Sequence, residues 1–419
     1  MKKLIAVISF GFLCIISYAQ EADTALVSRE NALNVYFDCD FCDMTYFRQN
    51  FTLINYVRDR KVADVQIIVT TMDNGGGGIE FKFQFVGLGK FDNMTDTITF
   101  NTKADATSDE IREMQLSVVK RGLAPFILKT PFADKVQISY TEEKEKIEEK
   151  DPWNNWVFNI NADGYFNGQK SYKSMHVFSS ASASRITEEI KHETSFDFNY
   201  SENQYKLYNN NDSLIYSAST YMRGVSFEHR TTWSMGDHWG SGVSVDAYQS
   251  TYSNIAFGAS VGPAVEYNVF KYSEASQKQL RFGYMLSAGY RDYVDTTIYN
   301  KTEEFIFRQS VEVNFKYITK WGSVRTGVYW RNYLHDFKLY SVSTYVGTQI
   351  RIFKGLSFNL YGNLSMPRNQ IGLVKSETTP EDVLLHQREL ETQYSYYTSV
   401  GLSYTFGSIY NNVVNPRLD

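Results

Sequence analysis

Two cysteines separated by two residues are the first side chains in the sequence whose type and spacing could do chemistry. Cys39 and Cys42 precede a predicted helix, and the N-terminus of a helix stabilises a thiolate. Asp38, Asp40 and Asp43 surround them, and nearby negative charge disfavours the thiolate. No two further metal ligands are spaced nearby, so no metal site is predicted. The pattern favours a structural disulfide, with a redox pair as the alternative.

A second group of candidate functional residues is the set of charged side chains at alternate positions in the C-terminal two-thirds of the chain. The first half of this region supplies acids, namely Asp163, Glu193, Asp197, Glu228, Asp246 and Glu266. The second half supplies bases with one exception, namely Arg281, Arg291, Arg308, Lys316, Arg325, Arg331 and Arg351, with Glu312 among them. If these positions enclose a lumen, an acidic wall faces a basic wall. In a narrow lumen the walls would pair and close it, whereas in a wide, wet lumen they would orient polar solutes.

Catalytic constellations are not found in the sequence. The histidines are scattered, at His176, His192, His229, His238, His335 and His386, and none lies in the His-x-Ser arrangement of outer-membrane phospholipases. The glycine run at 75–78 lacks the lysine of a phosphate-binding loop and precedes a strand, which favours a hairpin turn. The sequence therefore predicts no enzyme, no cofactor and no metal.

The elements that position the charges are predicted by a period of two residues. From 280 to 290 apolar side chains occupy every second position, and the same alternation returns from 305 to 317. Such alternation is typical of strands with one apolar and one polar face. The runs reach the roughly 9–11 residues that a membrane-spanning strand requires, and aromatic residues gather near their ends. We therefore expect the apolar face to meet lipid and the polar face to line a lumen.

The N-terminus and the composition agree with an exported envelope protein. Residues 1–19 have the pattern of a secretory signal, with Lys2 and Lys3 before an apolar run and a small-residue cleavage site at Ala19. Aromatic residues make up 16% of the chain, as interfacial girdles require. The net charge of -5 argues against a nucleic-acid partner. The mean hydropathy of -0.37 is expected for a barrel, because half of each strand faces water.

Residues 20–141 read as a separate small α+β domain, because strands and helices are mixed along them. Strands are predicted at 35–37, 63–72, 79–85 and 95–102, and helices at 44–58 and 108–123. A charged linker follows at 142–152.

From 153 to 406 we count about twelve strands, an even number as single-chain bacterial barrels need. Short turns are predicted near 186–189, 236–237, 273–277, 320–322 and 354–355, and longer connections at 202–212, 295–302 and 368–391. Short periplasmic turns and long outer loops alternate in this way, so both termini are expected in the periplasm, including a tail at 407–419. Within the last long loop, Thr379 and Pro380 read as the start of a helix that covers the mouth or packs on other loops.

The last strand carries a further pattern. Ser399, Gly401, Tyr404 and Phe406 resemble the signal by which barrel-assembly machinery recognises outer-membrane proteins. More broadly, the stretches 38–43, 55–60 and 405–417 resemble those of Gram-negative outer-membrane β-barrel proteins with a small periplasmic amino-terminal domain. The resemblance implies an architecture but no activity.

The sequence thus predicts a mainly β protein of the outer membrane, a transmembrane antiparallel barrel of about twelve strands with a small periplasmic α+β domain. Its expected partners are outer-membrane lipid, the assembly machinery and a periplasmic protein. The predicted function is a narrow channel for small polar solutes or a structural envelope component with a docking domain. The alternative is an outer-membrane hydrolase with a site at the extracellular rim.

Overall fold

The computed structural model describes residues 31–137, 151–319, 321–353, 355–377 and 388–407, together with 379, 382, 385 and 412. The predicted signal at 1–19, most of the charged linker and nearly all of the tail lie outside the described residues.

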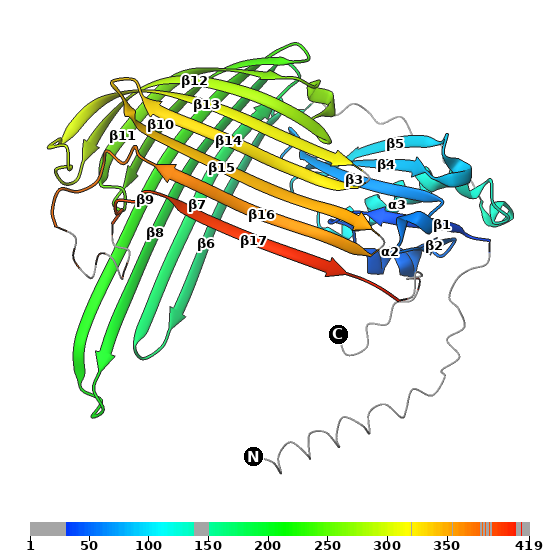
Figure 1. The fold of residues 1–419 in the computed structure, drawn as a ribbon, viewed down its shortest axis with the longest axis horizontal. Coiled ribbons are helices and arrows are strands. Elements are labelled where there is room, and N and C mark those ends of the chain that lie inside the picture. Colours follow the sequence, from blue (N-terminus) through cyan, green and yellow to red (C-terminus); the bar gives the residue numbers. More distant parts are fainter. Residues whose placement is uncertain are drawn as a thin grey trace.

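Two sheets make up the described chain, a five-stranded mixed sheet with helices and a twelve-stranded antiparallel sheet (Figure 1). This confirms the predicted fold class and the count of about twelve strands. No helix within the described ranges is long and apolar enough to cross a bilayer.

The small sheet has the strand order β2-β1-β3-β4-β5. Its strands are β1 (Leu33–Asp38), β2 (Ile54–Tyr56), β3 (Val65–Asp73), β4 (Ile79–Gly87) and β5 (Thr95–Asn101). β1 pairs in parallel with both of its neighbours, whereas β3, β4 and β5 are antiparallel. The glycine run 75–78 forms the turn between β3 and β4, where Gly77 has a φ of +74° that favours glycine.

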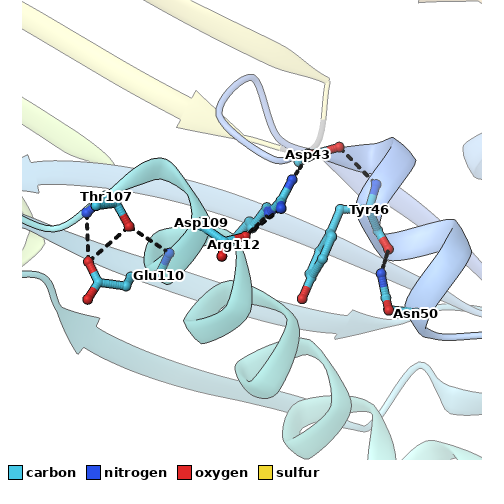
Figure 2. Close-up of polar contacts among 7 residues, drawn as sticks. All are labelled: Asp43, Tyr46, Asn50, Thr107, Asp109, Glu110 and Arg112. Atoms are coloured by element: carbon cyan, nitrogen blue, oxygen red, sulfur yellow. Dashed lines mark hydrogen bonds and ion pairs between the residues drawn. The ribbon is translucent and has the colours of Figure 1, made fainter.

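Two helices accompany this sheet, α2 (Met44–Asn50) and α3 (Ser108–Ile127). α3 begins with a reciprocal cap, in which the Thr107 hydroxyl accepts from the Glu110 amide and the Glu110 carboxylate accepts from the Thr107 amide (Figure 2). The hydrogen bonds that the Thr107 amide and hydroxyl donate to the Glu110 carboxylate lower the pKa of Glu110. Arg112 in the first turns of α3 pairs with Asp109 and reaches Asp43, the cap of α2, at 3.4 Å. The starts of the two helices are therefore tied together.

The predicted helix at 44–58 is wrong in its second half. α2 ends at Asn50, and residues 54–56 instead form β2, which pairs with β1. The Tyr56 hydroxyl hydrogen-bonds the carbonyl oxygens of Phe47 and Phe51, at 2.8 and 2.9 Å, and so closes the helix end. The apolar spacing that suggested a longer helix comes from side chains that pack into one core from two different elements.

The core of the small domain lies between the sheet and α3. Phe83 and Phe85 of β4 are fully buried, as are Val119 and Leu123 of α3. Gly122 lets the helix approach closely, because a Cβ at that position would lie 2.1 Å from the ring of Phe85. The packing at this contact therefore requires glycine inside a helix, where glycine is otherwise unfavourable.

Replacing Gly122 with alanine is expected to destabilise the small domain despite alanine's higher helix propensity. Overpacking against Phe85 costs about 1–3 kcal/mol, whereas the gain in propensity is about 1 kcal/mol. Thermal unfolding of the purified chain, followed by near-UV circular dichroism, tests this. The control is Ser117→Ala on the exposed side of the same helix. If Gly122→Ala raises the unfolding temperature as much as Ser117→Ala does, the close contact does not limit stability.

The large sheet runs from β6 to β17 in chain order, with every neighbouring pair antiparallel. Its strands are β6 (Trp156–Gly168), β7 (Tyr172–Ile186), β8 (Ile190–Tyr208), β9 (Leu214–Met235), β10 (Trp239–Ser250), β11 (Ile255–Asn268), β12 (Lys278–Tyr293), β13 (Glu303–Thr319), β14 (Gly322–Tyr333), β15 (Asp336–Phe353), β16 (Leu356–Pro367) and β17 (Ser395–Tyr404). β6 and β17 are the first and last strands of this order. The sheet is strongly curved, and the small domain lies beside one end of it (Figure 1).

Short connections follow β7, β9, β13 and β15, and we call the end where they lie the short-turn end. The connection after β11, 269–277, lies at the same end and is longer than the short turn predicted there. At the other end, the connection after β14 is also short, at 334–335. The small domain sits at this end, since Gly75 approaches Ile186, the last residue of β7, and Gln277, just before β12, donates a hydrogen bond to Gln84. The long connection predicted at 202–212 is shorter than expected. Strand pairing continues to Tyr208, because the alternation of β8 matches that of β9 along its whole length. Only 209–213 connect the two strands.

Candidate functional site

All the predicted lumen charges lie on one face of the large sheet. Residues that are directly opposite in an antiparallel ladder point to the same side, and the pairings connect the charges from strand to strand. Glu228 is opposite Asp246, for example, and Lys316 is opposite Arg325. The register from Asp163 on β6 to Arg351 on β15 keeps the same face throughout. We call this the inner face, because side chains from many of its strands line a common cavity.

That cavity, of about 540 Å³, lies toward the end with the long connections. One wall carries the acids Asp197, Glu228 and Asp246 from β8, β9 and β10. The other wall carries the bases Arg291, Arg308 and Arg331 from β12, β13 and β14. The structure thus brings together six of the predicted charges in one cavity, with the acids on β8, β9 and β10, the bases on β12, β13 and β14, and β11 between the two groups. We call this the two-signed cavity.

Two of the three arginines of the cavity contact hydroxyl groups rather than acids. Arg291 donates from Nε to the Tyr248 hydroxyl at 2.8 Å, and Arg308 donates from Nε to Ser287 Oγ at 3.2 Å. Among the described residues, no carboxylate lies within 4 Å of Arg291, Arg308 or Arg331. Their positive charge is therefore not cancelled by direct ion pairs within the described chain.

Other inner-face charges do pair, but with neighbours. Arg281 lies between Glu266 and Glu312, at 3.5 and 3.1 Å, on adjacent strands. On the acidic wall, Arg230 pairs with Glu228 at 2.6 Å, two residues along the same strand. Lys191 likewise pairs with Glu193 at 2.7 Å. Sequence reasoning missed Arg230 and Lys191, although their spacing of two from predicted inner-face acids was the signal that could have found them.

Arg351 was predicted to line the lumen, and it lies on the inner face but binds the small domain. Its guanidinium donates to both carboxylate oxygens of Asp38, at 2.8 and 2.6 Å. The Tyr36 ring lies 5.0 Å from the guanidinium. Burial at this contact raises the pKa of Tyr36, and the charge of Arg351 opposes that rise. A forked pair of this kind fixes both distance and orientation.

Two more basic side chains of the inner face border the same contact. Asp38 and Asp40 of the small domain share a small pocket with Lys316, Arg325 and Arg351. Acids of one domain thus face bases of the other at the short-turn end. The basic half of the inner face therefore has two uses, one in the two-signed cavity and one in holding the small domain.

The two cysteines follow Asp38 closely in the sequence. Cys39 and Cys42 form a disulfide with 5.7 Å between their Cα atoms. The bond closes the loop that directly follows Asp38 and leads into α2. It limits the conformations of the residues that meet Arg351. The arrangement gives the disulfide a structural role beside the contact between the two domains.

A second contact joins the small domain to the C-terminal side of the chain. The Tyr56 amide donates to Asn412 Oδ1 at 2.7 Å, and Asn412 Nδ2 donates to Asn55 Oδ1 at 2.9 Å. Gln277 adds a hydrogen bond to Gln84 at 3.0 Å. The small domain is therefore held at three places by polar contacts.

The chain matches no family model and no curated protein sequence. Among solved structures it is similar to the translocator domain of the autotransporter NalP from Neisseria meningitidis. The identity is 12% and the TM-score 0.23, over 60% of this chain and 87% of that chain. At this identity and score the likeness says nothing about activity.

The loop between β16 and β17 forms part of the wall of the two-signed cavity, through residues 369–372 and Glu389. Ile371 is 2% exposed, and Asn254 Nδ2 donates to the Gly372 carbonyl oxygen at 3.0 Å. At the predicted helix start, Thr379 and Asp382 exchange hydrogen bonds of 2.9 and 3.1 Å. Leu384 and its neighbour at 383 lie outside the described residues. The described part of the loop therefore lines the cavity and packs against the connection between β10 and β11.

One nucleophile–histidine contact was missed by sequence reasoning. Ser201 Oγ lies 2.9 Å from His176 Nδ1, on neighbouring strands of the inner face. The two are separated by 25 residues, so no local motif indicates them. Within the described residues no acid forms an ion pair with His176, and no three metal-ligating side chains gather. His386 lies outside the described residues.

Proposed function

We propose that this protein is an outer-membrane β-barrel protein that passes small polar solutes along its inner face. We further propose that its N-terminal domain stands in the periplasm and covers the short-turn end. The observation that carries the proposal is the combination of an apolar outer face with a charged inner face. No catalytic step or cofactor is part of the proposal.

The outer face of the large sheet exposes more apolar surface than a protein in water tolerates. Phe282, Tyr284 and Leu286 on β12 are 44%, 39% and 40% exposed. The neighbouring strands continue this surface, with Phe305, Phe307, Val328, Val261, Val265, Val400 and Leu402 also exposed. All lie opposite to the inner-face charges in the alternation of their strands. Hydrocarbon is the environment that makes such a face stable.

Tryptophans support a membrane boundary at the short-turn end. Five of the six in the chain lie at or next to strand ends there, namely Trp153, Trp156, Trp233, Trp239 and Trp321. Tryptophan prefers the interface between lipid and water, since its ring is apolar and its N–H needs a polar partner. The small domain, which lies beyond these residues, would then stand outside the bilayer.

The contact between Asp38 and Arg351 supports a covering role for the small domain. It places acidic side chains of that domain against bases of the inner face, where they compete with any solute for the same charges. Hydrogen bonds to charged groups contribute about 1.5–3 kcal/mol, so breaking them shifts a docking equilibrium by roughly ten- to a hundredfold.

Planar-bilayer conductance of the purified protein tests the proposal. We expect low conductance from the unaltered protein and a clear increase, on the order of tenfold in open time, for Asp38→Asn and for Arg351→Gln. Lys271→Gln is the matched control, because it removes an ion pair with Asp237 at the same end without touching the small domain. If none of these proteins conducts, the solute pathway is excluded and a structural envelope role becomes the better explanation.

A further inference from the structure

The two-signed cavity contains three arginines that take no part in the contact with the small domain. Arg291, Arg308 and Arg331 converge on one wall from three successive strands, and the described chain supplies no carboxylate partner to any of them. Like charges this close repel each other, so the folded chain needs a reason to keep them together. A bound anion supplies one, because a guanidinium binds a carboxylate through two parallel hydrogen bonds.

The acids of the cavity restrict the kind of anion that could bind there. Asp197, Glu228 and Asp246 face the same space, and a solute with only negative charge would be repelled by them. Arg230 compensates Glu228, but no ion pair joins Asp197 or Asp246 to a base within the described ranges. Asp246 instead accepts from Ser260 Oγ at 3.0 Å, which fixes its carboxylate. The acids are therefore suited to bind a cation in the same cavity as the arginines.

The space and the surrounding loop fit a small molecule. A volume of about 540 Å³ falls within the roughly 300–1,000 Å³ of ordinary ligand sites. Gln370 in the β16–β17 loop donates to Glu389 Oε1 at 2.8 Å and to the Leu390 carbonyl oxygen at 2.9 Å. These bonds hold the loop over the cavity, so the wall on this side is built from ordered contacts.

We propose that the two-signed cavity binds a small zwitterionic solute of the amino-acid or short-peptide class. Its carboxylate lies on Arg291, Arg308 and Arg331, and its ammonium group lies on Asp197 and Asp246. The inference deepens the proposed function and rests on it for the route by which the solute enters. Binding itself is measured without any conductance, so the two can fail separately.

Saturation-transfer NMR on the full chain in detergent micelles tests this with alanyl-alanine as the probe. Two analogues of the same size serve as comparisons, the C-terminal amide, which lacks the carboxylate, and the N-acetyl derivative, which lacks the ammonium charge. We expect the dipeptide to bind and each analogue to bind at least about tenfold more weakly, because each loses one charge-assisted contact.

Amino-acid substitutions test whether the dipeptide binds in the two-signed cavity. Arg331→Gln is expected to weaken dipeptide binding by about tenfold, and it breaks no hydrogen bond or ion pair of the described chain, so it leaves the fold intact. Lys271→Gln is the control, since it removes a positive charge that lies outside the cavity and outside the contact with the small domain. The proposal is overturned if the dipeptide does not bind, if the analogues bind as well as the dipeptide, or if Lys271→Gln has the same effect as Arg331→Gln. If any of these results is obtained and the protein still conducts, the binding site is rejected and the proposed function stands.

Discussion

Replacing Leu286 with arginine is expected to prevent most of the protein from folding into a lipid bilayer. Leu286 lies on the outer face of β12, in the middle of the apolar surface, and is 40% exposed. If lipid covers this face, a guanidinium there costs about 2–4 kcal/mol at the bilayer midplane. The folded fraction in phospholipid vesicles, measured by the mobility of unheated samples in gel electrophoresis, is expected to fall severalfold.

Met285→Arg is the matched control for this prediction. Met285 directly precedes Leu286 on the same strand and lies on the inner face, opposite Ser310. A charge there meets water and other polar groups, so folding is expected to be close to that of the unaltered chain. Equal folding of Leu286→Arg and the unaltered protein would contradict the placement of the outer face in lipid, and with it the proposed function.

Truncating Phe85 to alanine is expected to unfold the small domain while the large sheet stays intact. Phe85 is fully buried between the sheet and α3, where it fills the space that Gly122 leaves. Removing a buried phenylalanine ring costs about 3–5 kcal/mol, a large part of the 5–15 kcal/mol that stabilises a typical domain. Limited proteolysis of the full chain in micelles is expected to cleave within residues 31–137 at least tenfold faster, since the cleavable state becomes more populated.

Leu128→Ala, next to the end of the same helix, is the control for Phe85→Ala. Leu128 is 46% exposed, so its truncation is expected to change the proteolysis rate little. If the small domain covers the short-turn end, Phe85→Ala also raises the conductance as Asp38→Asn does. Faster proteolysis without a rise in conductance would contradict the proposal that the small domain covers the short-turn end.

The large sheet could be predicted well from the sequence because its pattern is local. A strand in contact with two different media must alternate, and residues 280–290 and 305–317 display that alternation without reference to any distant residue. The same alternation placed every one of the predicted charges on one face, from Asp163 to Arg351. Strand ends were less predictable, as the extension of β8 to Tyr208 shows, because the ends depend on pairing with a neighbour.

The contacts of the candidate site could not be predicted in the same way. Asp38 and Arg351 are 313 residues apart, and nothing in the local sequence of either indicates the other. Local spacing also misled at 51–58, where apolar residues of a strand continued the period of a helix by coincidence. Alternation tells which face a charge occupies, but it does not tell that Arg281 pairs with two acids while Arg331 pairs with none among the described residues. Partners depend on side-chain length and on depth along the strand.

The hydrogen bonds between Asn412 and residues 55 and 56 join parts of the chain that are synthesised at different times. Residues 55 and 56 leave the ribosome early, whereas residue 412 follows the last strand of the large sheet. The contact of the small domain, which is made before the large sheet, is thus completed by a residue that is made after that sheet. A chain halted before that point can fold its amino-terminal part, yet it lacks one of the polar contacts that hold this part in place.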